Sequence, residues 1–272
     1  MPLKFEIKLE LKLKEKTQSQ IVTPDLLHGF FFNLLPPNLA EEFHKPSRFK
    51  PFSLWSRDIF NFNKALSDHN KENSTPSKEI TVTISFIKDE YYPAFLAALF
   101  ERKKKLFLGP YAVKLKMLDG KLIKNDQYQG FDEFLNISPH PYLYFYFKTP
   151  VVFKRGEMDY PLPEPRLVFK SLLNKWNYFS PFKVKVDLRK TLEEKICIIF
   201  AGIRTHKITL SLGSGITGFT GKAVFYGRNL TDEELLWLNI LGEFSNYAGV
   251  GRKTTMSFGM TRFEAHNKEK EL

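Results

Sequence analysis

The chain has 272 residues, of which 43% are hydrophobic and 26% charged, and its formal net charge is +11. This length accommodates one large domain or two medium ones with buried cores, and the composition excludes a wholly disordered chain. The excess of positive charge favours a polyanionic partner, nucleic acid first and an anionic membrane second, with charge for solubility as the plain alternative.

The single cysteine, Cys197, occurs in the apolar run ICIIF, so an internal disulfide is excluded and we expect a buried small hydrophobe. The N-terminus alternates charge with leucine, unlike a signal peptide, and no segment approaches the ~18 apolar residues that a membrane span needs. We therefore expect a cytoplasmic protein with no membrane association.

Residues 3–13, LKFEIKLELKL, alternate apolar and charged side chains, the period of two typical of a strand with one solvated face. Thr23, Pro24 and Asp25 form a favoured helix start before LLHGFFFNLL, and NLAEEFHK predicts a second short helix. The segment FKPFSLW has the aromatic content of a strand, and residues 67–78 indicate a polar loop.

After this loop the chain continues with a strand, a helix and a strand. These are EITVTISFI, EYYPAFLAALFERKKK with cations at its C-terminal end, and KLFLGPYAVKLKML. The order β-α-β-β-α-β predicts a ferredoxin-like domain, in which two helices cover one face of a four-stranded antiparallel sheet.

Residues 119–141 are less regular and indicate a linker. Beyond them we predict a strand, a helix, a strand, one long strand or two, and another strand: YLYFYFKTPVVF, PRLVFKSLLNKWNYF, FKVKVDL, EKICIIFAGIRTHKITLSL and GFTGKAVFYG. A helix capped at Thr231 follows, and TMSFGMTRF closes the sheet. The sequence therefore predicts an α+β protein of two tandem ferredoxin-like domains, at residues 1–125 and 140–272.

The segment GVGRKTTMSFG, residues 249–259, lies between the last predicted helix and the last strand. Its three glycines suggest positive φ angles or close approach of another molecule to the backbone, and Arg252 and Lys253 supply positive charge. Such a segment is either an anion site or an ordinary helix-to-strand connection.

The histidines do not form a recognisable metal site. No two of them are four residues apart, and one cysteine cannot make a zinc knuckle, so we expect no metal dependence. His44 is followed by Lys45, Arg48 and Lys50, and neighbouring cations favour the neutral imidazole that a general base requires. His28 is either a packed helix residue or a second catalytic group.

Four motifs make the chain resemble the CRISPR precursor-RNA endoribonucleases of the Cas-six type, in the RAMP superfamily: HGFFFNLL, FHKPSRFKPFSLW, GITGFTGKAVF and GVGRKTTMSFGMTRF. The resemblance runs through nearly the whole chain. Its most specific part is the family's glycine-rich loop, which is matched by Gly249, Gly251, Ser257 and Gly259.

This resemblance implies an enzyme that needs no metal or cofactor and cuts CRISPR repeat RNA by attack of a 2′-OH, leaving a 2′,3′-cyclic phosphate and a 5′-OH. His44 matches the family's common catalytic histidine and Lys50 its charge-stabilising lysine. Arg48, Arg252 and Lys253 are expected to bind RNA with the glycine-rich loop. A CRISPR effector complex is a further candidate partner, and the chain is expected to be a monomer or homodimer.

One position departs from the family pattern. Some members carry a catalytic tyrosine where this chain has Phe32, so His28, one turn earlier, could replace it or be the principal catalyst. Three hypotheses remain: an active nuclease, a catalytically weak or inactive member that holds repeat RNA, and a general RNA-binding protein of the RRM type. The third ranks low because this chain lacks the RRM motif. Cations of the second half are candidate phosphate ligands or solvated surface: Arg155, Arg166, Lys170, Lys175 and Lys222.

Overall fold

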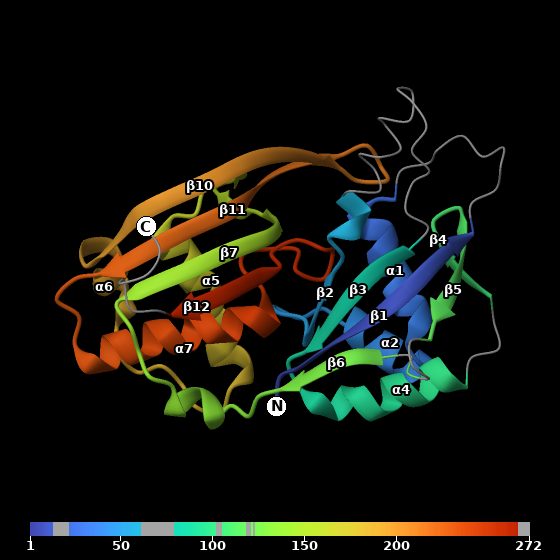
Figure 1. Cartoon of the computed structure of the whole chain (residues 1–272), viewed down its shortest axis with the longest axis horizontal. Coiled ribbons are helices and arrows are strands. Elements are labelled where there is room, and N and C mark those ends of the chain that lie inside the picture. Colours follow the sequence, from blue (N-terminus) through green and yellow to red (C-terminus); the bar gives the residue numbers. More distant parts are fainter. Residues whose placement is uncertain (13–21, 61–78, 102–104, 118–120, 122, 266–272) are drawn as a thin grey trace.

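The computed structural model describes residues 1–12, 22–60, 79–101, 105–117, 121 and 123–265. The predicted loop at residues 67–78 lies outside these ranges. Within them the chain forms two main antiparallel sheets, each with helices against one face, and the two units lie side by side (Figure 1).

The first unit carries every element of the predicted ferredoxin-like repeat and some additional ones. Its elements are β1 (Leu3–Lys12), α1 (Pro24–Leu34), α2 (Pro37–His44), β2 (Phe52–Trp55), β3 (Glu79–Phe86), a 3-10 turn (Asp89–Tyr91), α4 (Tyr92–Phe100), β4 (Leu106–Leu108), β5 (Tyr111–Lys116) and β6 (Ile123–Tyr128). The sheet order β2-β3-β1-β5-β4 contains the ferredoxin-like order in β2, β3, β1 and β5, so this part of the prediction is confirmed.

Two stretches of the first unit differ from the sequence prediction. KLFLGPYAVKLKML is not one strand but a hairpin of β4 and β5, because Gly109 adopts a φ of +56° that turns the chain. The expected linker contains β6, which pairs with the first half of β1 while β5 pairs with its second half. Both strands therefore share one edge of β1.

The second unit repeats the same arrangement. Its elements are a 3-10 turn (Glu133–Asn136), β7 (Tyr142–Val151), β8 (Phe153–Arg155), β9 (Met158–Tyr160), α5 (Pro165–Phe179), α6 (Leu188–Glu194), β10 (Ile196–Thr209), β11 (Gly215–Gly227), α7 (Asp232–Ala248) and β12 (Thr261–Ala265). The sheet order β10-β11-β7-β12 is again ferredoxin-like, and β8 and β9 form a separate hairpin. The prediction of two tandem ferredoxin-like folds is confirmed.

The predicted strand FKVKVDL is wrong, since residues 182–187, all described by the structure, form no strand. This segment is instead held against the end of α5, where the Trp176 indole donates to the Phe182 carbonyl at 2.6 Å and the Val184 amide donates to the Asn177 side chain at 2.9 Å. The long apolar segment after it is one strand, β10, rather than two.

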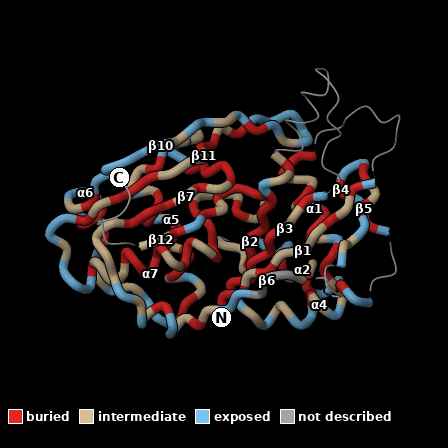
Figure 2. The backbone as a smooth tube through the Cα atoms, in the orientation of Figure 1, coloured by how far each residue is buried: buried red, intermediate tan, exposed pale blue. Residues whose placement is uncertain are grey.

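The expectation that Cys197 is buried is also wrong. It lies on β10, an edge strand with one hydrogen-bonded neighbour, and is exposed together with much of that strand (Figure 2). The apolar run ICIIF resembles a core strand, but the edge position leaves one side of it uncovered.

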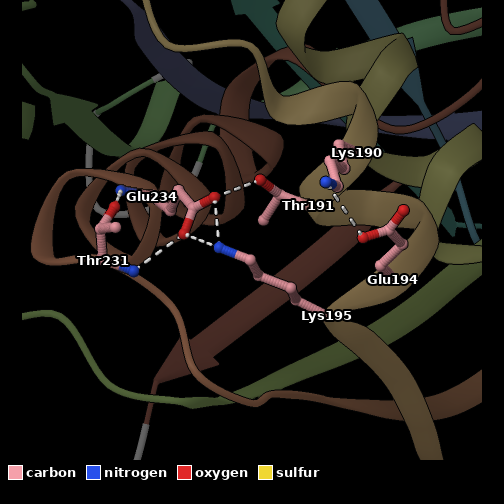
Figure 3. Close-up of polar contacts among 6 residues, drawn as sticks. All are labelled: Lys190, Thr191, Glu194, Lys195, Thr231 and Glu234. Carbon is pink, nitrogen blue, oxygen red and sulfur yellow. Dashed lines mark hydrogen bonds and ion pairs between the residues drawn. The ribbon is translucent and has the colours of Figure 1, made fainter.

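Helix α7 begins as predicted. The Thr231 side chain accepts a hydrogen bond from the Glu234 amide, and Glu234 accepts one from the Thr231 amide, which together form a capping box. The Glu234 carboxylate also pairs with Lys195 at 2.8 Å and accepts from Thr191 (Figure 3). These contacts join α6 and Lys195, the residue just before β10, to the start of α7.

Each unit has its own hydrophobic core, and part of the expected linker packs into the second one. The first core packs α1 and α4 on the first sheet, and the second packs α5 and α7 on the other. Phe134, from the expected linker, is fully buried in the second core beside Trp176 and Phe244. None of the described helices is both long and apolar enough to cross a membrane.

Candidate functional site

The two units meet where β2 lies against the glycine-rich loop, residues 249–259. The Leu54 amide donates to the Thr254 carbonyl at 2.9 Å, and the Ser257 amide donates to the Leu54 carbonyl at 2.9 Å. The loop is therefore bonded to the outer edge of β2 much as a further strand would be.

Side chains strengthen this junction. The Ser53 hydroxyl donates to the Ala248 carbonyl at 3.0 Å, and the Trp55 indole donates to the Phe258 carbonyl at 3.0 Å. The Ser257 hydroxyl accepts from the Ser56 amide and donates to the Ser56 carbonyl, and Ser257 is fully buried. Ser257 therefore fixes the loop to the first unit.

The backbone conformation of the loop and its packing against the rest of the protein explain its glycines. Gly249, Gly251 and Gly259 have φ angles of +64°, +79° and +77°, which side-chain-bearing residues rarely adopt. A Cβ atom on Gly251 would lie 2.6 Å from the Val152 carbonyl oxygen, and one on Gly259 would overlap the Val250 carbonyl.

Many loop amides are also bonded internally. Those of Val250, Gly251, Arg252 and Gly259 donate to the Gly259 carbonyl, the Ser171 hydroxyl and the Val152 and Pro150 carbonyls. An anion at this loop would therefore meet its side chains before these amides.

The two candidate histidines come together beside the loop. His28 lies on α1 and His44 is the last residue of α2. Both contact the Phe32 ring, whose centroid is 4.8 Å from that of the His28 ring and 4.1 Å from that of the His44 ring. His44 is exposed and His28 is partly buried. Sequence spacing alone did not show that both imidazoles contact one phenyl ring.

Hydrogen bonding fixes the state of His28. Its Nδ1 lies 2.8 Å from the Thr255 carbonyl oxygen, which can only accept, so Nδ1 carries a proton and, in the neutral imidazole, Nε2 keeps the lone pair. Burial lowers the pKa of His28 most, the bond to Thr255 raises it, and the charges of His44, Lys50 and Lys253 lower it further. His28 is therefore a neutral imidazole near pH 7, suited to a general base.

A pocket of about 250 Å³ lies next to this pair, between the two units. Its lining comes from the segment after α2, β2, the residue after β3, α5, the end of α7 and the glycine-rich loop: Arg48, Phe49, Lys50, Ser53, Ile87, Lys175, Phe179, Ala248, Gly251, Arg252, Lys253, Thr254 and Thr255. Of these described lining residues, the ones that carry a formal charge are all cations. Such a surface attracts a polyanion.

The individual cations are held in different ways. Lys50 donates to the Lys45 carbonyl at 2.7 Å, and the Arg48 guanidinium lies 5.3 Å from the Phe49 ring centroid. Arg252 pairs with Asp159 on β9 at 3.3 Å. Burial, and next the charge of Arg252, lower the pKa of Lys253.

The cations expected on the second unit are not brought to one place. Arg155 pairs with Glu164 at 2.6 Å and Arg166 with Glu193 at 3.0 Å, while Lys170 is exposed. Lys222 lies over the rings of Tyr144 and Tyr146, with its Nζ 5.1 and 5.4 Å from their centroids. Lys175 alone among the five lines the pocket between the units.

Two features of the site are not predicted from the sequence: the role of the Thr255 carbonyl, and the burial of Lys175, which the sequence offers as a phosphate ligand or a solvated surface residue. The Thr255 carbonyl, which orients His28, has no sequence signal because any residue supplies a carbonyl. Lys175 does have one, since it follows Val168 by seven residues and Leu172 by three, which places it on the apolar face of α5. Among the residues that the structure describes, no cluster of histidine, cysteine and carboxylate side chains could hold a metal ion.

A family model matches part of this chain. The model of CRISPR-associated endoribonuclease Cas6 covers residues 145–261, from β7 to the start of β12, and so includes the whole glycine-rich loop. The chain resembles the Cas6 endoribonucleases. No curated protein matches it.

Solved structures extend the Cas6 resemblance to the whole chain. A product complex of Thermus thermophilus Cas6 (TTHB231) is 25% identical with a TM-score of 0.79, covering 97% of this chain and 100% of that one. A product complex of another Cas6 (TTHA0078) is 26% identical with a TM-score of 0.71 over the same shares. A RAMP protein described as binding different RNA substrates, 15% identical with a TM-score of 0.57 over 96% and 99%, shares the fold.

Proposed function

We propose that this chain is a metal-independent endoribonuclease that cuts CRISPR repeat RNA within the precursor transcript. The observation that carries the proposal is the pair of imidazoles of His28 and His44, which both contact Phe32, beside a cationic pocket and the glycine-rich loop. The product complexes of the two similar Cas6 proteins support an RNA substrate.

The reaction needs a base, an acid and a cation. His28 Nε2 takes the proton of the 2′-OH, whose oxygen attacks the adjacent phosphorus. His44 gives a proton to the departing 5′-oxygen, so the products are a 2′,3′-cyclic phosphate and a 5′-OH. Lys50, with Lys253 nearby, stabilises the negative charge that develops on the phosphorane.

This assignment makes His28 the base and His44 the acid. It rests on the fixed tautomer of His28 and its lowered pKa, because a base must be unprotonated when substrate binds. The assignment also gives His28 the catalytic place that a tyrosine at position 32 holds in some similar proteins. Phe32 cannot fill that place, since a phenyl ring has no proton to exchange.

RNA binding is assigned to the rim of the pocket. Arg48, Arg252 and Lys253 would contact phosphates through their side chains. Gly249, Gly251, Ser257 and Gly259 would act by shaping the loop that carries Arg252 and Lys253. A CRISPR effector complex remains a candidate partner for the loaded protein.

The test is incubation of the chain with the repeat RNA of its own locus in the presence of EDTA. We expect one cleavage position, a 2′,3′-cyclic phosphate on the upstream product and no cleavage when the scissile nucleotide is 2′-deoxy. Tight, salt-sensitive binding without cleavage would identify a catalytically inactive member that holds repeat RNA. Cleavage that EDTA abolishes would contradict the mechanism.

A further inference from the structure

Lys175 is a lysine in a place where lysine is rarely found. It lies on α5 and is 8% exposed, beside Leu172 and Trp176, which are fully buried. Its Nζ donates to the carbonyls of Ala248 at 3.0 Å and Gly249 at 2.9 Å. These carbonyls end α7 and begin the glycine-rich loop, so Lys175 holds the loop at its first residue.

The position of Lys175 also serves the junction between the units. The Ser53 hydroxyl, from the first unit, donates to the same Ala248 carbonyl. A positive group at the C-terminal end of a helix is favourable because the carbonyls there carry partial negative charge. This end of α7 is thus bonded from β2 on one side and from α5 on the other.

The charge on Lys175 has no anion to balance it among the described residues that line the pocket. The other charged residues that line the pocket are Arg48 and Lys50 from the segment after α2, and Arg252 and Lys253 from the loop. Burial lowers the pKa of Lys175 to about 7. At pH 8 most of the molecules therefore carry a neutral amine at this position.

The protonation state of Lys175 determines how many N–H groups its Nζ can donate to a ligand in the pocket. A neutral amine has two, which suffice for the Ala248 and Gly249 carbonyls, while an ammonium has a third. That third N–H is left over for a ligand in the pocket. The volume of the pocket, about 250 Å³, is several times the ~30 Å³ that one water molecule occupies in the liquid.

Resting on the proposed function, we propose that the pocket binds one backbone phosphate of the RNA and that this phosphate holds Lys175 in its ammonium form. The phosphate supplies the missing anion. Binding of RNA above neutral pH therefore takes up a proton at Lys175. A lysine that served only to cap α7 would take up none when RNA binds.

The test is titration calorimetry at pH 8 with repeat RNA that is 2′-deoxy at the scissile nucleotide, so that no cleavage occurs. Comparing binding heats in HEPES and Tris buffers, which differ in ionisation enthalpy, gives the number of protons taken up. We expect about one proton for the wild type, because most Lys175 is neutral at this pH. Imidazoles contribute little there, since their ordinary pKa is about 6.5.

Two variants make the assignment specific. Lys175→Met keeps the length of the side chain, and we expect proton uptake close to zero and RNA affinity lower by about tenfold or more. Lys190→Met, at an exposed lysine on the neighbouring helix α6 outside the pocket lining, should retain both values. Unchanged uptake in folded Lys175→Met would overturn the proposal.

The wild type alone also tests the idea should the Met variant not fold. Uptake at Lys175 grows as pH rises through 7, whereas uptake by imidazoles falls over the same range. Wild-type binding with no uptake at pH 8 would overturn the role of Lys175 and leave the proposed function standing. A wild type that binds no repeat RNA would overturn both.

Discussion

His28 donates a 2.8 Å hydrogen bond from Nδ1 to the Thr255 carbonyl, a contact between the first helix and the glycine-rich loop near the other end of the chain. This bond has two effects. It joins the proposed base to the loop, and it fixes the tautomer that leaves Nε2 available. Under the proposed mechanism, the loop would therefore orient the base as well as contribute to RNA binding.

The first prediction separates the two histidines. His28→Ala and His44→Ala should each lower the cleavage rate by about 10²- to 10⁴-fold, as expected for loss of a general base or acid. Binding of 2′-deoxy repeat RNA should be nearly unchanged in His44→Ala, because His44 is exposed and outside the pocket lining. Single-turnover rates and a filter-binding assay measure both, and full activity in either variant would refute its assignment.

The second prediction concerns pH. Burial lowers the pKa of His28 below its usual 6.5, so the base is neutral down to a lower pH than an exposed histidine would be. We expect the loss of kcat/KM on the acid side to begin only below pH 6.5, as His28 gains a proton. The acid limb should persist in His44→Ala and disappear in the residual activity of His28→Ala. A limb that survives in His28→Ala belongs to another group.

The third prediction concerns Gly251. Gly251→Ala places a Cβ 2.6 Å from the Val152 carbonyl oxygen at a φ of +79°, and we expect a loss of about 2–4 kcal/mol of stability with weaker RNA binding. Gly213→Ala is the control, because Gly213 has a φ of +80° and no atom within 4 Å of the new Cβ. Gly213→Ala should lower the free energy of unfolding by only about 1–2 kcal/mol, the cost of placing a side-chain-bearing residue in the left-handed region. Urea unfolding and RNA titration measure both variants, and equal losses would show that backbone conformation alone requires glycine there.

The sequence predicted the fold better than it predicted the site. Alternation and capping residues placed β1 and α7 correctly, since both are local signals. The burial of Cys197 and a strand at residues 182–187 are wrong predictions, because an edge position in the sheet and packing against the end of α5 are set by other parts of the chain and not by local signals. The site needs contacts between residues far apart in the sequence, such as His28 and Thr255, which are 227 positions apart, and a carbonyl partner has no side-chain signature.

The glycine-rich loop shows the same limit. From the sequence, its glycines indicate either positive φ angles or close approach of another molecule to the backbone. The structure accounts for Gly251 and Gly259 by positive φ angles and by carbonyls of the protein itself. The amides of both residues are bonded internally, so the pattern of glycines located the loop correctly but did not say what lies against it.

The last prediction tests the cluster at the start of α7. Glu234 accepts hydrogen bonds from Lys195, Thr191 and the Thr231 amide, and these outweigh its burial and lower its pKa from 4.5 to about 2 (Figure 3). A carboxylate with a depressed pKa stabilises the fold above its unfolded-state pKa, and the stabilisation is lost as pH falls through the folded-state value. Glu234→Gln should therefore cost about 1–3 kcal/mol at pH 7.

The cost of Glu234→Gln should shrink as the pH falls from 4.5 toward 2, where the wild-type carboxylate becomes protonated. Urea unfolding of both proteins at pH 7 and pH 3 measures this difference. Glu194→Gln is the matched control, since its pair with Lys190 at 3.8 Å is exposed and should contribute less than about 0.5 kcal/mol (Figure 3). A cost for Glu234→Gln that is the same at both pH values would show that the side chain acts through packing rather than through its charge.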